Sequence, residues 1–124
     1  MLFQELTKKI IGCSFEVINE LGSGFLESVY EKALLIALKD SGLEVVAQQS
    51  IPVEFRNQNV GDFYADIVVE DEVLVELKAV KAILPEHQAQ VINYLRATGL
   101  QVGLLINFGN SQLEYKRFTR KKES

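Results

Sequence analysis

Three charged residues lie in two otherwise apolar segments of the chain. Glu76 and Lys78 interrupt the run 73–80, and side chains two residues apart in a strand point to the same face. Asp66 is embedded in a similar apolar run shortly before it. If the acidic turn between the two runs closes a hairpin centred near Asp71, Asp66 and Glu76 lie equally far from that centre and face each other across the ladder. We therefore expect two directly opposed carboxylates.

Opposed carboxylates in an apolar sheet need a compensating charge. Like charges facing each other cost up to about 1 kcal/mol even at exposed pairs, and burying an unpaired charge costs several kcal/mol more. A hard divalent cation such as Mg²⁺ offsets this cost by taking both carboxylates as oxygen ligands. Lys78 would then stabilise the charge that develops on a phosphate during in-line displacement. The pattern alone leaves a second interpretation open, a buried ion cluster without chemistry.

Two helical segments carry further candidate residues. Gly24, Glu27 and Tyr30 follow one another at a spacing of three, which would place them on one helix face, although an acid in a first helical turn is usually just solvated. Later in the chain His87, Gln90 and Tyr94 form a second stripe. His87 has no Cys or second His beside it, so the stripe is not a zinc site. Gln90 matters only if its helix packs beside the charged strands.

The elements that must position these residues are predicted from periodicity and turn residues. Apolar spacings of three and four predict helices, and alternating or continuous apolar runs predict strands. Three of the strands should form an antiparallel meander, with Pro52 near a sheet edge. We expect helices over 2–21, 25–40 and 85–98, and strands over 43–55, 60–69, 73–80, 101–107 and 113–118, the last as an edge strand.

The bulk properties bound the class of protein. The chain has 124 residues, 48% of them hydrophobic and 24% charged, which predicts one soluble globular domain over 1–124 with a solvated basic tail from about Arg117. A formal charge of -4 argues against a broad basic face for nonspecific nucleic-acid binding, although bound metal ions would add positive charge. The lone Cys13 fits a small buried hydrophobe in a reducing compartment. With no apolar run long enough for a membrane span, we expect a cytoplasmic protein without a membrane partner.

The run Gly24 to Tyr30, with the sequence GFLESVY, resembles the signature of the GxxExxY protein family. Further segments resemble the same family, which is classed with the PD-(D/E)xK nuclease-like superfamily: 65–66, 76–78, 90–94 and 104–109. The resemblance implies an α/β fold of the α+β type, a restriction-endonuclease-like core. Such a core consists of a helix, a three-stranded antiparallel meander, a further helix and a strand in a mixed sheet.

The resemblance also implies roles for particular residues. Ala65 replaces the proline of the superfamily's name, a departure that leaves the acidic ligand in place. The implied metal ligands are Asp66, Glu76, the Leu77 backbone carbonyl and Glu27, the last directly or through water. The implied catalytic residue beside them is Lys78, with Gln90 to orient water or phosphate, and the supporting residues are Tyr94, Tyr30 and Gly24.

The function implied in this way is an Mg²⁺- or Mn²⁺-dependent nuclease that hydrolyses phosphodiester bonds, with DNA as the expected substrate. Few elements beyond the core are available to read base edges, so sequence specificity would come from a partner protein or from DNA structure. The alternative is a catalytically silent nucleic-acid or protein binding module of the same fold, acting as a subunit of a larger assembly. A protein partner or homodimer remains open, since a shared fold does not establish a function.

Overall fold

The computed structural model describes residues 3–120, which form three helices and five strands. In chain order the elements are α1 (Gln4–Leu21), α2 (Glu27–Asp40), β1 (Val45–Phe55), β2 (Gln58–Val69), β3 (Val73–Lys78), α3 (Pro85–Thr98), β4 (Val102–Asn107) and β5 (Glu114–Thr119). All of the predicted helices and strands are present. Among the described residues, no helix combines the length and the apolar character needed to cross a membrane.

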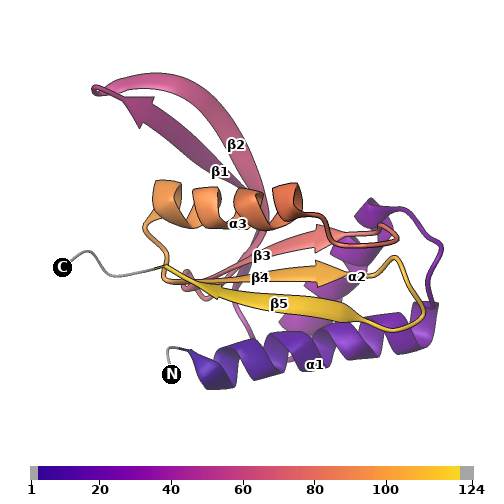
Figure 1. Ribbon diagram of the computed structural model, residues 1–124. Coiled ribbons are helices and arrows are strands. Elements are labelled where there is room, and N and C mark those ends of the chain that lie inside the picture. Colours follow the sequence, from indigo (N-terminus) through magenta and orange to yellow (C-terminus); the bar gives the residue numbers. More distant parts are fainter. Residues whose placement is uncertain (1–2, 121–124) are drawn as a thin grey trace.

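The five strands form one mixed sheet in the order β1-β2-β3-β4-β5 (Figure 1). The first three pair antiparallel, β3 and β4 pair parallel through the α3 crossover, and β5 pairs antiparallel at the far edge. The predicted meander and edge strand are thus confirmed, as is the hairpin centre at Asp71, because Val69 pairs with Val73. A mixed sheet of this kind with helices on both faces agrees with the restriction-endonuclease-like core.

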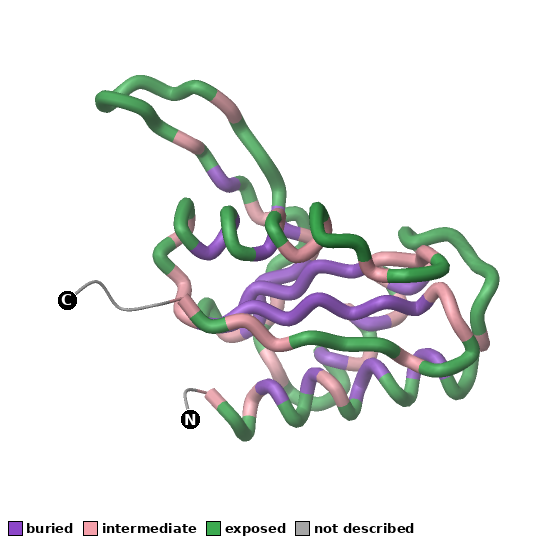
Figure 2. Tube along the Cα trace, viewed as in Figure 1, coloured by how far each residue is buried: buried purple, intermediate pink, exposed green. Residues whose placement is uncertain are grey.

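The helices cover the sheet on both faces and enclose two apolar cores. α1 and α2 lie on one face and α3 on the other (Figure 1). Side chains of β3 alternate between these cores: Val75 packs with the α1 and α2 residues, whereas Leu74 packs with α3. The α3 helix approaches β4 closely at Gly103, where an added Cβ would lie 2.7 Å from a methyl of Val91. β3 and β4 are accordingly buried along their whole length except at Lys78 (Figure 2).

Several element boundaries differ from the prediction. The second helix begins at Glu27 rather than near Phe25, and β3 ends at Lys78 rather than at Val80. The expected tail is wrong at its start, because Arg117 lies within β5. The rest of that tail, residues 121–124, lies outside the described residues.

The hairpin of β1 and β2 extends past the sheet as a two-stranded arm (Figure 1). Its tip turns at Arg56 and Asn57, which both have positive φ, as the tightest hairpin turns require. The outer part of the arm is largely exposed on both strands (Figure 2), including the aromatic side chains of Phe55 and Phe63. We call residues 52–63 the arm below.

Asn107, at the end of β4, anchors the chain just beyond Lys78. Its fully buried amide accepts hydrogen bonds from the backbone N–H groups of Val80 and Gly109 and donates to the Val80 carbonyl. The next residue, Phe108, donates its backbone N–H to the Lys78 carbonyl at 2.8 Å. These contacts continue the pairing of β3 and β4 after β3 itself has ended.

Replacing Asn107 with alanine should therefore lower the free energy of unfolding by about 2–3 kcal/mol. The substitution removes the partner of the part-buried N–H and C=O groups of Val80, and each unsatisfied buried group costs about 1–3 kcal/mol. Urea denaturation followed by circular dichroism measures the effect. The matched control is Asn110→Ala in the adjacent turn, which should cost less than about 1 kcal/mol because that amide is half-exposed. An equal loss in both variants would contradict the anchoring role.

Candidate functional site

Asp66 lies where β2 loses its regular pairing with both neighbouring strands. β1 and β2 pair on either side of Gln48 and Asp66 but not at these two residues, and Gln48 has a left-handed φ of 52°. On the other side, the ladder between β2 and β3 ends at Ile67 and Val75. The backbone of Asp66 is therefore released from the sheet, and side chains replace the missing ladder bonds.

Asp66 and Glu76 hold each other's strands by reciprocal hydrogen bonds. The Asp66 backbone N–H donates to Oε1 of Glu76 at 3.0 Å, and the Leu77 backbone N–H donates to Oδ2 of Asp66 at 2.8 Å. The expectation of a direct ladder pair is therefore wrong, although the register brings the two residues together as predicted. Because backbone N–H groups are donors, they reduce the repulsion that two facing carboxylates would otherwise have.

The carboxyl group of Glu76 is almost completely withdrawn from solvent, with 2% of the residue exposed. The pKa of Glu76 is raised from its ordinary value of 4.5 to about 8, chiefly by burial and then by the charge of Asp66. The backbone hydrogen bond from Asp66 and the charge of Lys78 act in the opposite direction. A group in this environment binds a proton at neutral pH unless another cation takes the proton's place.

The start of α2 brings more carboxylates to Asp66. Burial and then the charge of Asp66 raise the pKa of Glu27, while Lys78 lowers it. Glu31, one turn later, also has a raised pKa, from burial and from Asp66. The Gln48 amide bridges the strands and the helix by donating to Oε1 of Glu31 at 2.6 Å and to Oδ1 of Asp66 at 3.4 Å.

Glu31 and Gln48 are the residues that sequence analysis missed. A usable signal existed for Glu31, because residues four apart share a helix face and Glu31 lies four after Glu27. No local signal marks Gln48, which appears as one more polar residue in an alternating strand. Its role depends on the break in the ladder, which the sequence does not reveal.

The acidic cluster consists of Glu27, Glu31, Asp66 and Glu76. Lys78 is the cation that acts on Glu27 and Glu76, and Lys32 acts on Glu31. Negative charge is therefore in excess. Within residues 3–120, no three His, Cys, Asp or Glu side chains lie close enough together to hold a metal ion. The pair Asp66 and Glu76 nevertheless fits Mg²⁺, which binds through one or two carboxylates and keeps several waters. Glu27 fits an outer position, reached through water.

Gln90 and Tyr94 approach the acidic cluster from α3, which packs on β1, β3 and β4. Gln90 Nε2 donates to the Tyr94 hydroxyl at 3.0 Å. Burial raises the pKa of Tyr94, the Gln90 hydrogen bond lowers it, and the charges of Glu76 and Asp66 raise it further. Gln90 was expected to matter only if its helix packs beside the charged strands, and α3 does pack there.

The remaining predicted residues have structural contacts. Gly24 lies before α2 with φ 110°, so the expectation that it shares a helix face with Glu27 is wrong. The fully buried Tyr30 donates its hydroxyl to the Gly22 carbonyl at 2.6 Å and stacks on Phe108. These contacts hold the loop that leads into α2. His87 accepts the Leu84 backbone N–H through Nδ1 at the start of α3, away from any ligand role.

Comparison with known proteins agrees with this geometry. The family model described as the PD-(D/E)XK nuclease superfamily matches residues 4–118. No curated protein matches the chain significantly. Among solved structures, the fold is similar to the crystal structure of SSO0001, with a TM-score of 0.61 at 14% identity over 98% of this chain. It is also similar to an alkaline exonuclease (LHK-Exo) from Laribacter hongkongensis, with a TM-score of 0.52 at 17% identity over 70% of this chain. The matched regions span 62% and 52% of those two chains.

Proposed function

The chain belongs to the PD-(D/E)XK nuclease superfamily, and from this premise we propose that it is an Mg²⁺- or Mn²⁺-dependent nuclease that hydrolyses phosphodiester bonds of DNA. Nucleases of this superfamily generally depend on a divalent metal ion. The observation that carries the proposal is the pairing of Asp66 with the buried Glu76, beside a lysine, at the end of β3. This pairing supplies negative oxygen ligands and a nearby positive group in one place.

Each residue has a distinct part in the proposal. Asp66 and Glu76 hold the metal ion, with the Leu77 backbone carbonyl as a further oxygen ligand and Glu27 acting through water. A divalent cation at such a site polarises a phosphate oxygen and lowers the pKa of water that it binds. Lys78 places positive charge beside the phosphate, where charge develops during displacement.

Gln90 contributes orientation rather than charge. Its amide already has a fixed direction, because Tyr94 accepts one of its N–H groups. The remaining amide atoms can donate to a phosphate oxygen or accept from a water. A positioned group of this kind raises the rate because the reacting atoms are held in the geometry needed for attack.

Incubation of the protein with labelled single- and double-stranded DNA in Mn²⁺ or Mg²⁺ tests the function. We expect cleavage that EDTA abolishes and that Asp66→Asn reduces by at least about 100-fold, because the variant replaces a charged metal ligand with a neutral one. The matched control is Asp62→Asn, an exposed acid on the same strand, which should cut like the wild type. DNA binding without cleavage under any of these conditions would instead support a catalytically silent binding module.

A further inference from the structure

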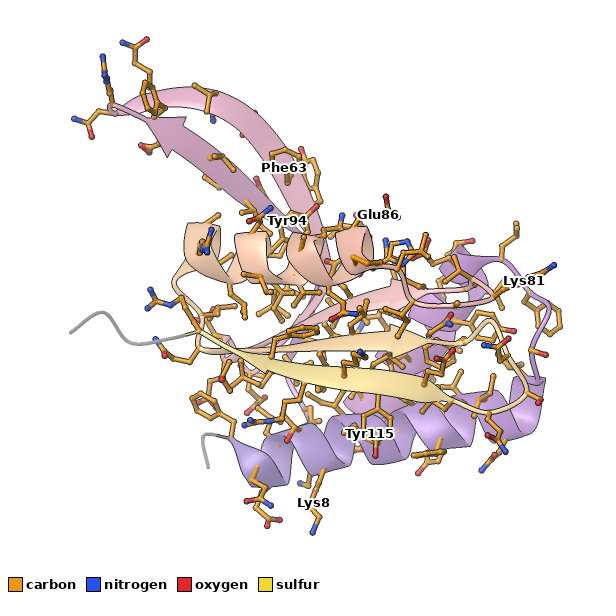
Figure 3. The ribbon with its side chains drawn as sticks, viewed as in Figure 1. Lys8, Phe63, Lys81, Glu86, Tyr94 and Tyr115 are labelled. Atoms are coloured by element: carbon orange, nitrogen blue, oxygen red, sulfur yellow. The ribbon has the colours of Figure 1, made fainter. Side chains whose placement is uncertain are left out.

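A cleft of about 900 Å³ lies between the arm and the outer side of α3. The arm lines it with Pro52, Val53 and Phe63, and α3 lines it with small and polar side chains such as Ala89 and Asn93. Figure 3 shows Phe63 on the arm above α3, with Tyr94 on the helix below it. The cleft is thus bounded by two elements far apart in sequence.

Two residues of α3 link the cleft with the candidate active site. Gln90 and Tyr94 line it, and the same Tyr94 lies within electrostatic reach of Glu76 and Asp66. A molecule that fills the cleft therefore contacts Gln90 and Tyr94, the two α3 residues beside the acidic cluster. This shared lining suits an occupant that is part of the substrate.

Phe63 provides an exposed aromatic surface in this cleft. Its residue is 46% exposed, and its ring centroid lies 6.0 Å from that of Tyr94, which is nearly buried. The ring also leans over Gly61, where an added Cβ would be 3.3 Å from the ring edge. Phe63 is therefore supported on two sides while its remaining surface stays open for stacking.

The charges around the cleft disfavour a phosphate within it. Glu54 and Glu86 contribute two carboxylates to its walls, and Arg96 contributes one guanidinium. Phosphate backbones are bound mainly by basic side chains, whereas a base is neutral and presents a π-face to an aromatic ring. The lining therefore suits a base, and the acidic side chains keep the phosphates outside.

We propose that the cleft holds an unpaired base of a single-stranded nucleic acid, stacked on Phe63, while the attached phosphate lies at the acidic cluster. A base in a duplex is stacked on both faces and paired along one edge, so it cannot occupy the cleft without leaving the helix. The inference rests on the nucleic-acid substrate of the proposed function and adds its strandedness.

Fluorescence polarisation with Ca²⁺ in place of Mg²⁺ or Mn²⁺ tests the inference, because Ca²⁺ also takes oxygen ligands and so offsets the charge of the acidic cluster. A denaturing gel of the same samples checks that the strand stays intact. The probes are a labelled single strand, the same strand in a blunt duplex, and an abasic strand of equal length. We expect the single strand to bind at least about 10-fold more tightly than the other two, since base stacking on an aromatic residue has effects of this size. Phe63→Ala should remove that preference, and Phe63→Trp should retain it.

Phe55→Ala is the matched control, because Phe55 is a more exposed aromatic residue on the same arm but does not line the cleft. Its affinity for the single strand should equal that of the wild type, and thermal melts should show all three variants folded. Equal affinity for the abasic strand, no measurable binding of any strand, or an equal loss in both alanine variants would overturn the inference. The last result would indicate that the arm is a general apolar docking surface for a protein.

DNA cleavage in Mn²⁺, measured separately, distinguishes failure of the base site from failure of the proposed nuclease function. If the protein cleaves DNA but binds the abasic strand as tightly as the normal single strand, the base site alone is overturned. Base-dependent binding without any cleavage would overturn the nuclease function and leave the base site standing.

Discussion

Lys78→Ala is expected to reduce DNA cleavage by about 10²- to 10³-fold while the protein remains folded. Lys78 is the cation whose charge acts on both Glu27 and Glu76. It lies at the end of β3, half-buried and two residues after Glu76, on the same face of the strand. Removing one preorganised positive group from a partly dry site typically costs about this much in rate.

Single-turnover cleavage with saturating enzyme measures the effect on the chemical step separately from binding. Lys81→Ala is the matched control, since Lys81 follows three residues later and is exposed in the loop (Figure 3). It should retain the wild-type rate within about twofold, as surface substitutions usually have small effects. A Lys78→Ala variant that cuts as fast as the Lys81→Ala variant would remove Lys78 from the mechanism.

Stability of the metal-free protein should fall as the pH rises from about 6 to 8.5. The pKa of Glu76 is raised to about 8 by burial and by Asp66, so the folded state binds more protons than the unfolded state between its ordinary value of 4.5 and about 8. Stability therefore decreases across that window. At about 1.4 kcal/mol per pH unit, this group alone lowers the free energy of unfolding by about 2–3 kcal/mol. The raised pKa values of Glu27 and Glu31 act in the same direction.

Urea unfolding at several pH values in EDTA measures this dependence. Glu76→Gln should flatten it, because the neutral amide does not titrate, whereas Glu72→Gln in the exposed turn between β2 and β3 should leave it unchanged. Mn²⁺ at about 100 times its Kd should restore roughly 2.7 kcal/mol to the wild type at pH 8.5. The Glu76→Gln variant should gain much less. A wild type whose stability is the same at both pH values, or is unaffected by Mn²⁺, would contradict a metal-binding pair at Asp66 and Glu76.

Most of the fold follows from local features of the sequence. The α3 helix begins at Pro85 and ends at Thr98 as predicted, because proline suits a first helical turn and Gly99 adopts the left-handed φ of 78° that terminates it. The hairpin centre at Asp71 is equally local, since a short acidic turn joins two apolar runs. The sequence did not predict strand ends that depend on distant contacts. β3 ends at Lys78, and the Asn107 side chain then forms hydrogen bonds with the backbone of Val80.

The sequence by itself determined which charges stand in apolar strands and, by alternation, that Glu76 and Lys78 share a face. Only the tertiary structure decided how those charges are satisfied. The pairing of β2 breaks at Asp66 on both sides, so side-chain oxygens accept backbone N–H groups that a regular ladder would use. Gln48 lies at the same break in pairing, and its amide donates to Glu31 and Asp66, which brings both Gln48 and Glu31 into the site. Hydrogen bonds between residues distant in sequence depend on the packing of whole elements, which local periodicity cannot specify.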